Sequence, residues 1–126
     1  MSYSATIDVP ELGAGVAFYA ALGWRERARP LPVMAVLEQD GQSLLLMQKQ
    51  AGSKPTPAEG PRRDYARHWT PVHLDFHVAD YDAALAAALA AGATCEARHE
   101  TMPGRPRVAF LSDPFGHGFC LIEQHP

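Results

Sequence analysis

The segment HLDFHVADYDAALAAALAAGA, which runs from His73 to Ala93, decides the fold class of this chain. At its start polar and apolar side chains alternate, a period that is typical of a half-buried strand. Asp80 suits the N-cap of a helix over residues 81–91, because its carboxylate can accept bonds from the first helical N–H groups. Gly92 then suits the position just after the helix, where the backbone commonly adopts the left-handed conformation that glycine favours. The segment therefore predicts a strand followed directly by a helix.

The same pattern occurs earlier in the chain, without a gap from the first strand to the end of the helix. Ser4 aligns with His73, and Gly23 aligns with Gly92. Such self-similarity indicates an internal duplication. Strand-like segments follow each predicted helix, and the pair Asp40-Gly41 is a strong signal for a hairpin turn. These segments cover residues 24–29, 33–38 and 43–48 in the first half, and 94–99, 107–111 and 117–123 in the second.

Together these elements predict an α+β fold of two βαβββ repeats. We expect one domain over residues 1–126, with the first repeat over residues 2–50 and the second over residues 72–126. Each repeat should form a curved sheet with a helix on one face. The other face should then pack against another part of the protein. Joined together, the open faces would form an incomplete eight-stranded barrel around a cavity.

Residues 51–71 are predicted to form a linker or long loop, because they are rich in proline and glycine. The loop carries a basic and aromatic cluster of Arg62, Arg63, Asp64, Tyr65, Arg67, His68 and Trp69. In one interpretation the loop is a lid, in which Trp69 and Tyr65 stack on a ligand while Arg62 or Arg67 contacts its anionic group. In the other it is a solvated loop with a packed tryptophan. The residues leave both interpretations open.

Composition narrows the class of protein. The chain is 47% hydrophobic and 20% charged, with a formal net charge of −3, as in an ordinary globular domain. No basic stripe marks a nucleic-acid surface, and no apolar run approaches the roughly 20 residues of a membrane span. The start of the chain lacks the pattern of a secretory signal, and Cys95 and Cys120 lie far from any Cys-x-x-Cys spacing. We expect a cytoplasmic protein with reduced thiols.

Strand parity places polar side chains on the open face of each repeat. If the predicted helix covers the apolar side of the second repeat's first strand, His73, Asp75 and His77 lie on the opposite side. By the same parity Ser4, Thr6 and Asp8 lie on the open face of the first repeat. The candidate ligand-binding residues of the predicted cavity are Ser4, Thr6, His73, Asp75, His77, Cys120, Gln48, Trp69 and Arg67. The alternative is that these strand positions simply face solvent on an open sheet.

Three stretches of the chain resemble a known superfamily. They are the segment from His73 to Ala93, the helix end FYAALGW at residues 18–24, and the ending DPFGHGFCLIE at residues 113–123. With the paired βαβββ pattern, they resemble the glyoxalase/bleomycin-resistance/extradiol-dioxygenase superfamily, also called vicinal oxygen chelate proteins. The resemblance implies the barrel fold and a homodimer. It does not fix an activity, because one fold hosts many functions.

The resemblance also implies where a metal would bind. Metal-using members of the superfamily have four ligands, on the first and last strands of the two repeats. Those positions here are Ser4, Leu45 or Leu46, His73 and Cys120. The superfamily has His or Gln, Glu, His and Glu in that order, so only His73 matches. Because leucine cannot bind a metal and hard divalent ions prefer oxygen ligands, we expect no cofactor at the usual position.

A different metal set remains open, formed by His73 with Asp75, His77 or Cys120. These side chains share a face, and a thiol added to imidazole and carboxylate gives a mixture that suits zinc. Nickel, manganese and iron are the further alternatives. The opposite interpretation is that these groups are hydrogen-bonded residues lining a cavity.

Two functions follow from the residues and the resemblance. The first is a binding protein that holds a small organic molecule in the cavity between the repeats, as resistance-type members of the superfamily do. The second is a metal-dependent lyase, isomerase or dioxygenase that acts on a small oxygen-chelating substrate. The catalytic residues are unknown. One hypothesis makes Cys120 a nucleophile with His73 as its base, and the alternative is an inert buried thiol.

Overall fold

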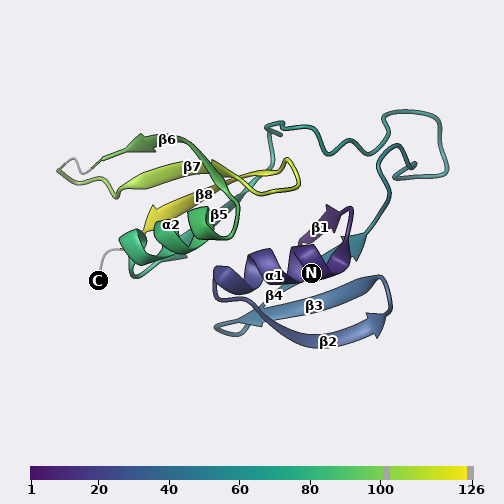
Figure 1. The fold of residues 1–126 in the computed structure, drawn as a ribbon, viewed down its shortest axis with the longest axis horizontal. Helices are drawn as coiled ribbons and strands as arrows, with labels where there is room; N and C mark the ends of the chain where they lie inside the picture. The colour runs from purple at the N-terminus through teal and green to yellow at the C-terminus, as the bar shows by residue number, and fades with distance from the viewer. Residues whose placement is uncertain (101–102, 125–126) are drawn as a thin grey trace. The chain divides into compact units, whose positions relative to one another are not determined.

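The structure is a computed structural model that describes residues 1–100 and 103–124. It confirms an α+β fold of two βαβββ repeats (Figure 1). The first repeat contains β1 (Thr6–Val9), α1 (Leu12–Ala21), β2 (Arg25–Leu31), β3 (Met34–Gln39) and β4 (Gln42–Gln48). The second repeat contains β5 (Leu74–Val78), α2 (Tyr81–Ala90), β6 (Thr94–His99), β7 (Val108–Ser112) and β8 (Gly118–Glu123).

Each repeat builds a sheet of the same topology. The strand order is β1-β4-β3-β2 in the first repeat and β5-β8-β7-β6 in the second. In both, the first strand runs parallel to the last, and the remaining neighbours are antiparallel. This agreement is what an internal duplication predicts. None of the described helices has the length and apolar character needed to span a bilayer.

The helix α1 lies close to its sheet because a glycine faces the strands. A Cβ atom at Gly15 would come within 3.1 Å of Val9 and 3.3 Å of Leu46, and both neighbours are fully buried. At the start of the helix, the Glu11 carboxylate accepts hydrogen bonds from the two N–H groups of Gly13 and Ala14, at 2.8 and 2.6 Å. Packing and this cap therefore hold a helix whose glycines would otherwise weaken it.

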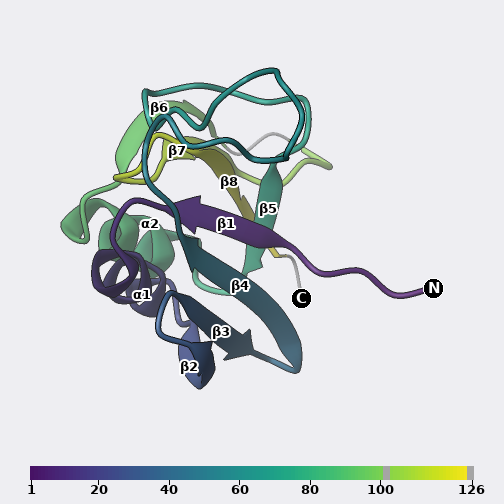
Figure 2. The same ribbon diagram turned by 90° about the vertical axis from the view of Figure 1, so that its right-hand side faces the viewer.

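The helix α2 begins as predicted at Asp80, whose carboxylate accepts a bond from the Ala83 N–H at 3.1 Å. It buries Tyr81, Leu85 and Ala88, and it lies against one face of the second sheet (Figure 2). The predicted left-handed exit is confirmed at Gly92, where φ is +111°. The first sheet shows the same local chemistry, since Asp40 and Gly41 form the predicted hairpin with φ of +51° and +76°.

The segment that follows β4 folds back on the first repeat. The Gly52 N–H donates to the Arg63 carbonyl at 2.7 Å, and the Arg63 N–H donates to the Ser53 carbonyl at 2.9 Å. The Arg63 guanidinium also pairs with Asp8 of β1 at 2.7 Å. The loop between residues 53 and 63 is therefore closed at its base and attached to the first sheet.

Residues beyond Tyr65 associate with the second repeat. The Tyr65 hydroxyl still donates to the Lys49 carbonyl, at 2.6 Å, but the His68 N–H donates to the Gly116 carbonyl at 3.1 Å. Internal contacts accordingly divide the chain into two units, Met1–Tyr65 and Ala66–Pro126. Sequence composition predicted one linker over residues 51–71, and its two ends belong to different units.

Candidate functional site

Strand register divides the second sheet into two faces. Leu74 and Phe119 are neighbours on β5 and β8, and their side chains lie on the side that α2 covers. Asp75, Cys120 and Phe110 are neighbours on the opposite side, across β5, β8 and β7. We call this side, defined by Asp75, Cys120 and Phe110, the open face of the second repeat. The parity predicted for β5 therefore agrees with the register.

Three of the predicted site residues come together on this open face. One donor atom each from His73, Asp75 and Cys120 lies within 4.8 Å of the others. The His73 Nε2 atom is 3.2 Å from the Asp75 Oδ1 atom. Asp75 and Cys120 are direct neighbours in the ladder, and His73 precedes Asp75 by two residues on the same side. Among the described residues, His77 is not part of this trio, because its neighbour on β8 is Ile122, farther along the strand.

The thiol of Cys120 is buried and protonated at neutral pH. Its residue is 3% exposed, and burial together with the nearby Asp75 carboxylate raises the pKa of the Cys120 thiol to about 11. A cysteine nucleophile normally has a lowered pKa instead, so this environment favours the inert-thiol interpretation for the metal-free protein. Cys95 is the register neighbour of Leu111, on the side of the sheet that α2 covers. The two thiols therefore lie on opposite sides of one sheet, and neither forms a disulfide.

Trp69 covers the start of β8 beside the trio. A Cβ atom at Gly118 would lie only 2.5–2.8 Å from three atoms of the indole ring, so only glycine fits beneath it. The ring of His73 meets the indole edge-to-face with centroids 5.6 Å apart, and Phe110 lies at 6.3 Å. Trp69 remains 42% exposed. An aromatic side chain that the sequence placed in a loop therefore borders the open face.

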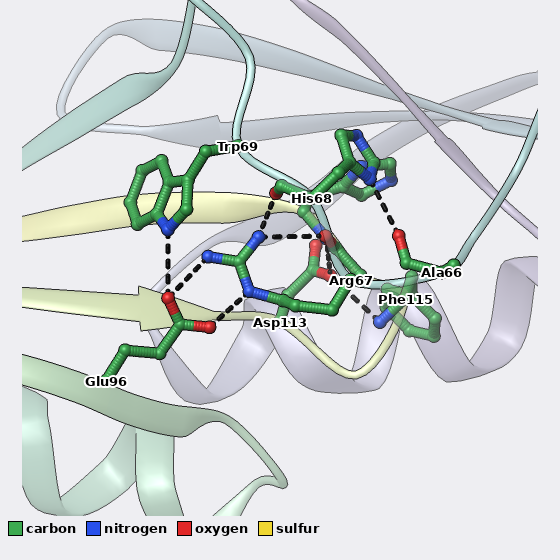
Figure 3. Close-up of polar contacts among 9 residues, drawn as sticks. Ala66, Arg67, His68, Trp69, Glu96, Asp113 and Phe115 are labelled. Atoms are coloured by element: carbon green, nitrogen blue, oxygen red, sulfur yellow. Dashed lines mark hydrogen bonds and ion pairs between the residues drawn. The ribbon is translucent and has the colours of Figure 1, made fainter.

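A carboxylate on β6 holds Trp69 in this position (Figure 3). Glu96 accepts a hydrogen bond from the indole Nε1 at 2.9 Å and forms a two-point ion pair with the Arg67 guanidinium. That guanidinium also lies 4.8 Å from the indole centroid and donates to the His68 and Gly116 carbonyls. The hydrogen bond from Arg67 lowers the pKa of Glu96 below its usual value.

Glu96 was not among the residues that the sequence predicted for this site. It lies beside a register shift between Cys95 and Ala97, where strict alternation along the strand fails. Sequence parity therefore could not assign the side of Glu96. The available signal was an acidic residue in a strand of a chain whose long loop is rich in arginine.

The remaining predicted residues lie elsewhere. Gln48 lies on the helix side of the first sheet, where its Oε1 accepts a bond from the Leu12 N–H at 2.9 Å. Ser4 and Thr6 belong to the first repeat, in which Thr6 is the neighbour of Leu45. Tyr65, predicted to act with Trp69 in a lid, is bonded within the first unit, whereas Trp69 belongs to the second.

The register of the first sheet decides between the two leucines that sequence alignment left open. Leu46 is fully buried on the α1 side, against Gly15. Leu45 lies on the opposite side with Thr6, as Cys120 lies with Asp75 in the second repeat. The open face of the first repeat carries the half-buried apolar side chains of Met34, Val36, Leu45 and Met47 together with the half-buried carboxylates of Asp8 and Glu38.

Comparison with known proteins shows the family to which the chain belongs. A family profile described as "Glyoxalase-like domain" matches residues 4–122, nearly the whole chain. The chain belongs to the glyoxalase-like domain family. A search of curated protein sequences found no match.

Several solved structures share the fold of this glyoxalase-like protein. A glyoxalase/bleomycin resistance protein from Catenulispora acidiphila is 22% identical, with 99% of both chains covered and a TM-score of 0.64. A lactoylglutathione lyase from Agrobacterium tumefaciens is 20% identical, with 98% and 92% covered and a TM-score of 0.65. The fosfomycin resistance protein FosX from Listeria monocytogenes, solved with manganese(II) and sulfate, is 16% identical, with 99% and 90% covered and a TM-score of 0.73.

The metal set expected of the superfamily does not fit these residues. Its four positions hold Ser4, Leu45, His73 and Cys120, and the register selects Leu45 over Leu46 for the second of them. Leu45 offers no lone pair. The carboxylates on its side of the sheet, Asp8 and Glu38, lie elsewhere in the register and form ion pairs with Arg63 and Arg27. The position of Leu45 thus lacks the oxygen donor that the resemblance implies there.

Proposed function

We propose that this glyoxalase-like protein binds a small organic molecule at the open face of its second repeat, without the superfamily's usual metal set. The single observation that carries the proposal is the fixed position of Trp69 over Gly118, next to His73 and Phe110. Binding sites for small molecules combine apolar or aromatic walls with a few well-placed polar groups. His73 and Asp75 supply such polar groups, and both are exposed.

The proposal can be tested with tryptophan fluorescence. The chain has two tryptophans, so the Trp24→Phe variant leaves Trp69 as the only reporter. A panel of aromatic and oxygen-rich small molecules should contain ligands that change its emission and raise the melting temperature. Trp69→Leu should weaken their binding roughly tenfold, because an aromatic contact contributes up to about 1.5 kcal/mol. Ligands that bind Trp69→Leu and His73→Ala as tightly as the unaltered protein would contradict the proposal.

A metal-dependent enzyme that acts on a small oxygen-chelating substrate is the second candidate. One observation favours it, namely the close approach of donor atoms from His73, Asp75 and Cys120. A divalent metal held there would act as a Lewis acid on a substrate oxygen. The test is a lyase assay on a glutathione hemithioacetal with added nickel or zinc. Turnover that disappears in His73→Ala would favour this candidate over a binding protein.

We further infer a cytoplasmic homodimer; the superfamily resemblance supports the dimer, and the two widely spaced cysteines, Cys95 and Cys120, support the location. Light scattering coupled to size-exclusion chromatography should give twice the 13.7 kDa mass of one chain. A mass of one chain at all accessible concentrations would remove the dimer from the proposal.

A further inference from the structure

The geometry points to a zinc site contained within the second repeat, with His73, Asp75 and Cys120 as its three ligands. All three come from β5, β8 and the residue just before β5. The superfamily's usual site instead takes ligands from both repeats, and it has no ligand at the position of Asp75. The inference goes beyond the proposed binding of an organic molecule, and it rests on the same three residues as the second candidate function, for which it specifies the metal and the ligand set.

The distances between the donor atoms already approach those of a tetrahedral zinc site. Zinc lies about 2.0 Å from imidazole nitrogen and about 2.3 Å from thiolate sulfur, so two of its ligand atoms are roughly 3.3–3.8 Å apart. In the structure all three donor atoms lie within 4.8 Å of one another, and His73 and Asp75 are 3.2 Å apart. Small side-chain rotations are therefore sufficient, and a metal would replace the direct His73–Asp75 contact.

The backbone holds the ligands in place before any metal binds. Asp75 and Cys120 are paired residues of a parallel ladder, and Phe110 flanks Cys120 on the next strand. Trp69 flanks His73 on the other side, held there by Gly118 beneath it. Cys120 is buried, so its sulfur is kept from competing reactions with solvent. A ligand set supported by strands and packed neighbours is more precise than one on a loop.

The donor chemistry selects the metal. A thiolate with an imidazole and a carboxylate suits zinc, whereas magnesium and calcium prefer oxygen ligands alone. Three protein ligands leave a fourth tetrahedral position open, as in zinc sites that bind water or a substrate oxygen. The site would therefore take an anionic or neutral oxygen of a small molecule at that position.

Cobalt(II) titration of the tag-free, reduced, full chain tests the inference, since cobalt(II) reports thiolate ligation by its ultraviolet charge-transfer absorption. We expect one equivalent of cobalt to bind with this absorption and with the visible bands of a tetrahedral site, and zinc to displace it. Cys120→Ser should abolish the charge-transfer band. Cys95→Ser is the matched control and should retain it, because Cys95 lies on the other side of the same sheet.

The other two ligands are tested in the same titration. His73→Ala and Asp75→Asn should each weaken cobalt binding at least tenfold, whereas His77→Ala, on the same face, should bind as the unaltered chain does. Circular dichroism checks that each variant is folded, and Cys120→Ala replaces Cys120→Ser if the serine variant is not. The inference is overturned if no stoichiometric cobalt binds, if the band survives in both Cys120 variants, or if His77→Ala loses binding as His73→Ala does. None of these outcomes depends on whether an organic ligand binds.

Discussion

Gly118 shows how one missing side chain determines the open face of the second repeat. The indole of Trp69 occupies the space that any Cβ at this position would need. Backbone conformation does not demand glycine here, since the positive φ values of this strand region belong to Gly116 and not to Gly118. Contact with Trp69 is therefore the reason for glycine.

Gly118→Ala should displace Trp69 and destabilise the protein by about 1–3 kcal/mol, the usual cost of overpacking. Urea unfolding measures the change in free energy, and the emission maximum of Trp24→Phe protein reports the new exposure of Trp69. In a Trp69→Ala background the same substitution should cost almost nothing, because the clashing ring is absent. An equal cost in both backgrounds would mean that Trp69 does not occupy this space.

Cys120 should react with iodoacetamide more slowly than Cys95 at pH 8 in the metal-free protein. The thiolate is the reactive form, and burial with the Asp75 carboxylate nearby holds the pKa of Cys120 at about 11. Cys95 is only half-buried. Mass spectrometry of peptides from timed reactions gives both rates, and equal rates would show that Cys120 is accessible and ionised.

At the scale of elements, the ion pair of Arg67 with Glu96 fastens the segment before β5 to the edge strand β6. The pKa of the Glu96 carboxyl lies below its unperturbed value of 4.5, so the folded state favours the ionised form. The stabilisation is fully present above that value and is lost as the pH falls through the lower, folded pKa.

We therefore expect Glu96→Gln to lower the melting temperature at pH 7 and to have a progressively smaller effect below pH 4.5. Differential scanning calorimetry between pH 7 and pH 3 makes the comparison. Glu59→Gln is the control, since the Glu59 side chain is 84% exposed and its ion pair should contribute little. A constant difference across the pH range would show that ionisation of Glu96 is not the cause.

The helix α1 offers a second test at this scale, because it has two glycines with different surroundings. Gly15→Ala should destabilise the protein, since Val9 and Leu46 are buried and cannot move away from a new methyl group. Gly13→Ala should be neutral or stabilising by up to about 1 kcal/mol, since only the flexible Glu11 side chain is near and alanine favours helix. Chemical unfolding of both variants measures the two changes in free energy of unfolding. Equal effects would mean that α1 does not approach the sheet so closely.

Elements with strong local signals were predictable from the sequence. Asp80, Gly92 and the Asp40-Gly41 pair determine caps and a hairpin through their own backbone preferences, and each has the expected role. Pairing between strands was harder, because the choice between Leu45 and Leu46 depends on a register that local patterns do not contain. The side of Glu96 depends on a bulge for the same reason.

At the scale of the whole chain, the two repeats share a topology but differ in the chemistry of their open faces. In the first repeat that face carries methionine and leucine beside the ion-paired carboxylates Asp8 and Glu38. In the second repeat a histidine, an aspartate and a cysteine place donor atoms within 4.8 Å of one another. The sequence placed His73, Asp75, His77 and Cys120 on one face because alternation along the first and last strands of the second repeat is regular, and the structure brings together three of the four. Gln48 was predicted to line the cavity but lies on the helix side of the first sheet. A shift of one residue in register moves a side chain to the other side of a sheet, and the sequence pattern did not determine that register.

The closed base of the loop between residues 53 and 63 has a practical consequence for protein engineering. Its two ends are joined by backbone hydrogen bonds between Gly52, Ser53 and Arg63, so the chain enters and leaves at one point. Lengthening such a loop adds only a small entropic cost, about 0.6 kcal/mol for each doubling. A fluorescent or affinity module inserted near Glu59 would thus leave the strand pairing of the first sheet intact and give the protein a built-in reporter.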